Sequence, residues 1–192
     1  MRVGMTMEEN LEYMLGSLDN YTNQVINRLV KNLVTNGVAT EKEAEQGEKV
    51  YIGDKLSKKQ GLRHCLSISS LAVQSVEKWE FEKNYKYSFF LTQENFSEKK
   101  LKKLIENEKV KLYDDLKGYE PLYVVAERPT VRFYEDNLYL KFLIKLKATD
   151  TEGNQSKCRY PIIVIIYSKS DIIEVRFDSM GSMYYRDKFK IG

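Results

Sequence analysis

The sequence predicts an α+β fold, with a long N-terminal amphipathic helix and short helices packed on a mainly antiparallel β-meander. Apolar residues recur at helical spacing near the N-terminus, whereas apolar and polar residues alternate over most of the chain after Pro121. Short turn signals separate the alternating runs. Such tight turns join antiparallel strands, because parallel pairing needs crossovers of a dozen or more residues.

Length and composition are those of an ordinary globular protein. The chain has 192 residues, of which 42% are hydrophobic and 31% charged, enough to bury a core without disulfides or metals. We divide it into an N-terminal helical region, 1–49, and an α+β domain, 50–192. The formal net charge of +3 does not require a polyanionic partner, since dedicated nucleic-acid domains are usually more basic.

The first element is predicted as one helix, from a capping box formed by Thr6 and Glu9 to a stop at Asn36-Gly37. Its apolar stripe comprises Met7, Leu11, Met14, Leu15, Leu18, Tyr21, Val25, Leu29 and Leu33. About 28 helical residues would reach roughly 40 Å, which exceeds what a domain of this size needs. The helix therefore either breaks, near Gly16 or near Asp19-Asn20, or projects and pairs with a partner.

The pattern between residues 40 and 95 is mixed. A short helical linker is expected at Thr40–Lys49, and Ser57 with Gln60 caps a helix that continues to Val76. A strand around Leu66–Ser69 is the alternative, because serine is a poor helix former. Period-two alternation then predicts a hairpin of two strands, Trp79–Glu82 and Tyr85–Phe89.

The C-terminal half combines one more helix with the meander. Ser97 caps a short helix whose expected buried edge is Leu101, Leu104 and Ile105. The predicted strands are Leu122–Ala126, Val131–Tyr134, Leu138–Lys147, Lys157–Tyr167, Ile172–Phe177 and Met183–Phe189. The run Pro161–Tyr167 is apolar on both faces, which predicts a central strand that a helix covers.

Alternation also assigns faces within these strands. The apolar residues expected to face the core are Leu138, Leu140, Phe142, Ile144 and Leu146. The residues between them, expected to face solvent, are Tyr139, Lys141, Lys145 and Lys147. Glu174 and Arg176 are likewise expected on the solvent side of their strand.

No catalytic residue, metal site or cofactor is predicted. His64 is the only histidine, which removes the usual nucleophile–base pairs unless His64 is itself the base. Cys65 and Cys158 lie far apart in sequence without companion metal ligands, so two reduced thiols are expected, as in a cytoplasmic protein. The sequence has neither an apolar run long enough to span a membrane nor a glycine-rich phosphate loop.

Two groups of basic residues are candidates for polyanion contact. The first lies on the predicted short helix and comprises Lys99, Lys100, Lys102 and Lys103. The second follows the Ser57 cap and comprises Lys58, Lys59 and Arg63. Interleaved acidic residues such as Glu98 also fit a solvated helix face, so polyanion binding gains support only if the fold brings the two groups together.

The leading hypothesis is a non-enzymatic macromolecular binding or assembly module from an AT-rich prokaryote or its mobile element. The N-terminal helix would bind a second copy or a protein partner through Leu11, Met14, Leu18, Tyr21, Val25 and Leu29. The alternative is a nucleic-acid-binding protein that uses the basic helix around Lys99–Lys103. A metal-dependent nuclease with acidic residues such as Asp171 and Glu174 comes third.

Overall fold

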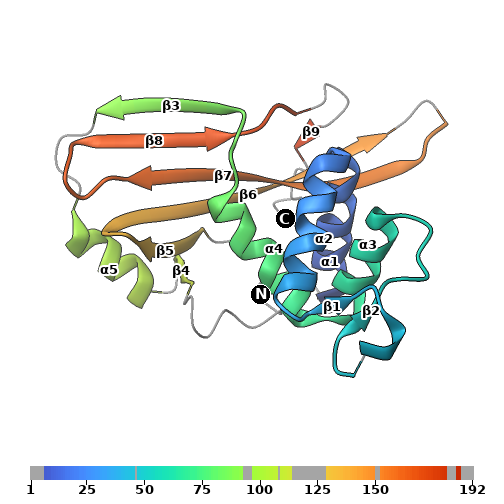
Figure 1. The fold of residues 1–192 in the computed structure, drawn as a ribbon. Helices are drawn as coiled ribbons and strands as arrows, with labels where there is room; N and C mark the ends of the chain where they lie inside the picture. Colours follow the sequence, from blue (N-terminus) through green and yellow to red (C-terminus); the bar gives the residue numbers. More distant parts are fainter. Residues whose placement is uncertain are drawn as a thin grey trace.

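The computed structural model describes residues 7–45, 47–92, 97–107, 109–113, 129–149, 152–180 and 185–186. Its architecture is α+β, as predicted, with helices packed on a mainly antiparallel sheet of seven strands (Figure 1). Helices α1 to α4 gather toward one end of the sheet, and α5 lies at the other end. None of the helices within the described ranges combines the length and apolar composition needed to cross a membrane.

The seven-stranded sheet has the order β3-β8-β7-β6-β5-β4, and β9 pairs with β6 outside this path. Its strands are β3 (Tyr87–Thr92), β4 (Lys111–Leu112), β5 (Thr130–Tyr134), β6 (Asn137–Thr149), β7 (Gln155–Ile166), β8 (Ile172–Phe177) and β9 (Tyr185–Arg186). Every pair is antiparallel except β4 with β5. The predicted meander is confirmed from β5 to β8. The strand expected at Leu122–Ala126 lies outside the described residues, as does most of Met183–Phe189.

The prediction of one long N-terminal helix is wrong, because the helix is interrupted. The elements are α1 (Met7–Ser17), the 3₁₀ turn η1 (Leu18–Asn20) and α2 (Asn23–Thr35). The interruption lies beside Asp19-Asn20, one of the two expected places. Thr22 has an extended backbone and caps α2, its hydroxyl accepting the Val25 N–H at 3.4 Å. Gly37, with a φ of +71°, follows the end of α2 as predicted.

Helices also occupy most of the middle of the chain. The elements there are β1 (Ala39–Thr40), the 3₁₀ turn η2 (Glu43–Glu45), β2 (Val50–Tyr51), α3 (Lys58–Ile68) and α4 (Ser70–Glu82), with β1 and β2 forming a small parallel sheet. Ser57 caps α3 as predicted, and Ser69 caps α4. The alternative strand at Leu66–Ser69 and the predicted strand at Trp79–Glu82 are therefore wrong. In Trp79–Glu82, polar and apolar residues alternate because the charged Glu80 occupies a buried position on helix α4, next to the buried Phe81.

The main core lies between helices α1 to α4 and one face of the sheet. Its buried members include Met14, Leu18, Ile26, Leu29, Leu62, Leu66, Val76, Phe81, Ile163 and Ile165. Helix α1 approaches β7 so closely that a Cβ at Gly16 would overlap the carbonyl oxygen of Lys157. The adjacent Ser17 hydroxyl accepts the backbone N–H of Arg159 at 3.0 Å. Strand β7 is therefore central and covered by helix, as its apolar run predicts.

Helix α5 (Glu98–Glu106) covers the opposite face of the sheet. The Ser97 hydroxyl caps it as predicted, accepting the Lys100 N–H at 3.4 Å. The small core beneath it comprises Leu101, Val110, Val131 and Leu138. Ile105 packs against this core, but Leu104 is 44% exposed, so the predicted buried edge is confirmed only in part.

Charged side chains on β6 and β8 face inward, which corrects the prediction that they face solvent, whereas Leu138 and Leu146 are buried as predicted. Lys141 and Lys145 are 1% and 6% exposed, whereas Phe142 is 38% exposed. Glu174 is 4% exposed instead of facing solvent. Alternation separates the two faces of each strand correctly; the error lies in assigning the charged face to water. The carboxylates of Glu77 and Glu80 satisfy Lys141, and Ser88, Tyr167 and Arg176 satisfy Glu174, as buried charges require.

A buried cluster of four charged side chains joins α4 to β6 and β7. Glu77 and Glu80 of α4, Lys141 of β6 and Arg159 of β7 are each at most 3% exposed. The Lys141 amine donates to both carboxylates, at 3.2 Å for Glu80, and to the Glu77 carbonyl oxygen at 3.1 Å. The Arg159 guanidinium spans the same two carboxylates, reaching Glu80 at 2.7 Å. Two positive and two negative charges therefore balance one another out of contact with water.

Replacing Lys141 with methionine tests the strength of this cluster. The variant keeps the apolar stem but leaves two buried carboxylates facing a single guanidinium. Removing one partner of a buried ion pair costs about 3–5 kcal/mol, so we expect the free energy of unfolding, measured by urea denaturation, to fall by that amount. Lys169→Met is the control, because Lys169 pairs with Asp136 while both side chains are mostly exposed, and its loss should be about 1 kcal/mol or less. Equal losses in the two variants would contradict the assignment.

Candidate functional site

The apolar stripe predicted to bind a partner lies against the protein's own core. Met14, Leu18 and Leu29 are at most 2% exposed, and Leu11, Tyr21 and Val25 are partly buried beside them. Helix length no longer favours a partner either, because α1 and α2 are separate helices. Association through these residues stays a prediction that would require the helices to leave the core.

The two basic groups lie on different parts of the molecule. Lys99, Lys100, Lys102 and Lys103 are exposed on α5, whereas Lys58, Lys59 and Arg63 begin α3 near the far end of the sheet (Figure 1). The α3 group is already partly neutralised: Lys58 pairs with Glu41, and Lys59 and Arg63 pair with Asp19 at 3.5 and 2.7 Å. The fold does not bring the groups together, so the condition that would favour a joint polyanion site is not met.

The residues considered for catalysis are dispersed. Cys65 and Cys158 are free and buried, and burial raises the pKa of each thiol to about 11. Glu135 and Asp136 form the turn between β5 and β6, with φ values of 48° and 62°. Within the described ranges, no three His, Cys, Asp or Glu side chains are placed to hold a metal ion.

Strand β3 forms an edge of the sheet and is the most exposed apolar element among those that the structure describes. It pairs with β8 along one side, and no other described strand lies along its second side. All six of its residues are exposed; Phe89, Phe90 and Leu91 reach 58%, 65% and 57%. The sequence predicts a strand at Tyr85–Phe89 but not that it lies at the edge of the sheet. The signal that could have drawn attention to this strand is the uncharged run that continues to Thr92.

This edge lacks the features that normally prevent strands from pairing with other chains. Protected edges carry charged residues, proline or bulges. The β3 sequence, Tyr-Ser-Phe-Phe-Leu-Thr, has no charge and no proline, and its register with β8 is continuous from Tyr87 to Thr92. The Phe89 ring stacks on Phe177 of β8 with centroids 5.6 Å apart. A regular, largely apolar strand whose outer side pairs with no described strand is thus presented to solvent.

A buried carboxylate holds β3 to β8. Glu174 accepts hydrogen bonds from Ser88 at 2.8 Å, Tyr167 at 2.6 Å and Arg176 at 2.8 Å. Burial acts to raise the pKa of the Glu174 carboxyl, but the hydrogen bonds from these three partners outweigh it and lower that pKa to about 2. The edge strand is therefore fixed in place without help from its outer side.

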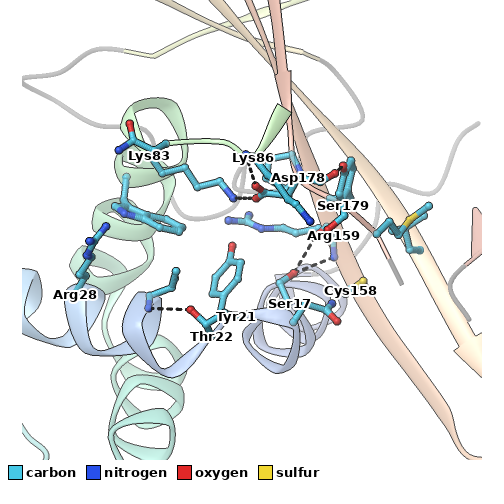
Figure 2. A pocket seen from close by; sticks show the side chains of 18 of the residues that line it. Ser17, Tyr21, Thr22, Arg28, Lys83, Lys86, Cys158, Arg159, Asp178 and Ser179 are labelled. Carbon is cyan, nitrogen blue, oxygen red and sulfur yellow. Dashed lines mark hydrogen bonds and ion pairs between the residues drawn. The ribbon is translucent and has the colours of Figure 1, made fainter. Parts of the chain in front are cut away.

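A pocket of about 610 Å³ opens beside the start of β3. The start of α2, the end of α4, β7 and the segment after β8 enclose it (Figure 2). The Lys83 amine pairs with Asp178 and lies 4.3, 5.2 and 5.6 Å from the ring centroids of Tyr85, Trp79 and Tyr21. Burial, followed by the charge of Glu80, raises the pKa of Tyr21 and Tyr85 well above the usual value, so both phenols stay neutral.

No protein-family model, curated protein or solved structure matches the chain. The functional proposals below therefore rest on β3 and on the neighbouring pocket.

The low pKa of Glu174 predicts that the free energy of unfolding falls at acid pH. Because this pKa lies below its usual value near 4.5, ionised Glu174 stabilises the fold above that pH, and the contribution is lost as the pH falls toward 2. We expect Glu174→Gln to flatten the dependence of unfolding free energy on pH between 4.5 and 2. Denaturation at several pH values measures it. Asp171→Asn, an exposed neighbour, is the control; an unchanged slope for Glu174→Gln would refute the assignment.

Proposed function

We propose that the protein is a non-enzymatic assembly module in which β3 of one copy pairs with β3 of a second copy. The single observation that supports this is an uncharged edge strand of six exposed residues, whose second side pairs with no strand in the described part of the chain. Pairing would continue the sheet across the two copies through main-chain hydrogen bonds and cross-strand contacts between large side chains. The proposal keeps the assembly hypothesis and moves it from the N-terminal helix to the sheet edge.

Charge favours an antiparallel over a parallel arrangement of the two copies. Lys86 immediately precedes β3 and is exposed. Parallel pairing would set the two Lys86 side chains side by side, whereas antiparallel pairing separates them by the length of the strand. Six residues span about 20 Å, well beyond the Debye length of about 8 Å in physiological salt. A two-fold antiparallel pair is also closed, so it predicts a dimer instead of a filament.

Analytical ultracentrifugation over a range of concentrations tests the proposal. We expect a reversible dimer with a Kd on the order of 10 µM, because a pair of short strands buries a small interface. Phe90→Lys places like charges across the two-fold axis and should raise this Kd by at least about tenfold. Phe133→Lys is the matched control, since Phe133 is 58% exposed on β5. A monomer at all concentrations, or equal effects of the two variants, would overturn the proposal.

A second candidate function is nucleic-acid binding through α5. The observation that favours it is the exposure of Lys99, Lys100, Lys102 and Lys103, none of which forms an ion pair with another described residue. Such a surface binds phosphates without sequence preference, and the affinity falls as salt rises.

Fluorescence anisotropy with labelled duplex DNA tests this second candidate. Binding should weaken between low and moderate salt and should be lost when all four α5 lysines are changed to glutamate. Glutamate at Lys58, Lys59 and Arg63 is the control and should have a smaller effect, because carboxylates already neutralise those residues. Salt-independent affinity, or binding that survives the α5 changes, would reject this function.

A further inference from the structure

We propose that the pocket beside β3 binds a small organic anion in which a flat heteroaromatic ring is joined to a phosphate, as in a nucleotide. The cavity volume of about 610 Å³ lies within the range of about 300–1,000 Å³ typical of small-molecule sites. The pocket also lies where four separate segments of the chain converge (Figure 2). This inference is independent of the pairing of β3.

One wall of the pocket suits a flat ring. Trp79 and Tyr21 meet edge to face, with ring centroids 5.5 Å apart, and both are only partly buried. Tyr160 and Pro161 of β7 continue this apolar lining. Aromatic side chains bind flat rings by stacking or edge contacts. Asn20 and Asn84 add exposed amides that donate and accept hydrogen bonds, which favours a ring with polar heteroatoms over a hydrocarbon.

Most charged residues that line the pocket are already in ion pairs. Lys83 pairs with Asp178, and Arg159 pairs with the carboxylates of α4. The remaining acid, Glu82, pairs with Arg132 on β5.

Arg28 and Lys86 complete the set of lining cations. Both are exposed, and neither forms an ion pair with any residue in the described part of the chain. The mouth of the pocket therefore carries an excess of two positive charges. A phosphate monoester, with a charge of about −1.5 to −2 at pH 7, matches this excess better than a single carboxylate.

The N-terminus of α2 adds to this preference. Thr22, which caps the helix, and Val25, in its first turn, line the cavity. The Thr22 hydroxyl accepts the Val25 N–H, so the helix start contributes its partial positive charge, which stabilises an anion. The cations and the helix N-terminus thus favour the phosphate of the ligand, while the aromatic wall favours its ring.

Intrinsic fluorescence reports on the pocket, because Trp79 is the only tryptophan in the chain and lines the cavity. The probes are the four common ribonucleoside monophosphates, the matching nucleosides and inorganic phosphate. We expect at least one monophosphate to change the Trp79 emission saturably, with a Kd below about 1 mM, and its nucleoside and phosphate alone to bind at least about tenfold more weakly.

Two double variants separate recognition from general charge. Arg28→Gln with Lys86→Gln should raise the Kd of the monophosphate at least about tenfold. Lys31→Gln with Lys109→Gln removes the same charge from exposed positions outside the pocket and should leave the Kd within about twofold. The thermal midpoint of each variant shows that it folds. Phe90→Lys should bind normally, which distinguishes this inference from the proposed assembly.

Three outcomes would overturn the inference. The first is the absence of a saturable response to any monophosphate. The second is equal affinity for phosphate and for the monophosphate, which would remove the role of the ring. The third is an equal effect of the two double variants, which would reduce the binding to nonspecific charge.

Discussion

Two carboxylates and two cations, buried between α4 and the sheet, set the arrangement on which the rest of the structure depends. Taking each charge out of water costs several kcal/mol, and the mutual pairing of Glu77, Glu80, Lys141 and Arg159 offsets that cost. The pairing also selects one register. A shift of β6 or β7 by one residue would turn its cation to the opposite face and leave two buried carboxylates facing a single cation. Helix α4 is thereby fixed over two central strands.

The two candidate functional features follow from this placement. Because α4 ends at Glu82, Trp79 and Lys83 lie over the start of α2, where they form one side of the pocket. The chain then leaves α4 and enters β3 at the sheet edge, where Glu174 holds the strand from within. The pocket and the exposed edge therefore adjoin through Lys86. Ligand binding and assembly would use neighbouring surfaces of one fold.

Local physical chemistry made part of this structure predictable from sequence. Ser57 and Ser97 cap their helices because a side-chain oxygen satisfies a nearby N–H, and period-two alternation locates the strands after Pro129. The inward facing of Lys141 and Glu174 was not predictable in the same way, since their partners lie far away in the sequence. The exposure of Phe90 likewise depends on strand order, which no local pattern contains. The pocket forms only where four separate segments meet in the fold. Its residues lie far apart in the sequence, so no local pattern predicts it.

The claim that β3 is the assembly surface is tested most directly by hydrogen–deuterium exchange at low and high protein concentration. We expect amides of residues 87–92 to exchange more slowly as the concentration rises, while those of α1 and α2 do not change. Protection of this kind reports the free side of β3 becoming hydrogen-bonded. Concentration-dependent protection in α1 and α2, with β3 unchanged, would contradict the account and return the interface to the N-terminal helices.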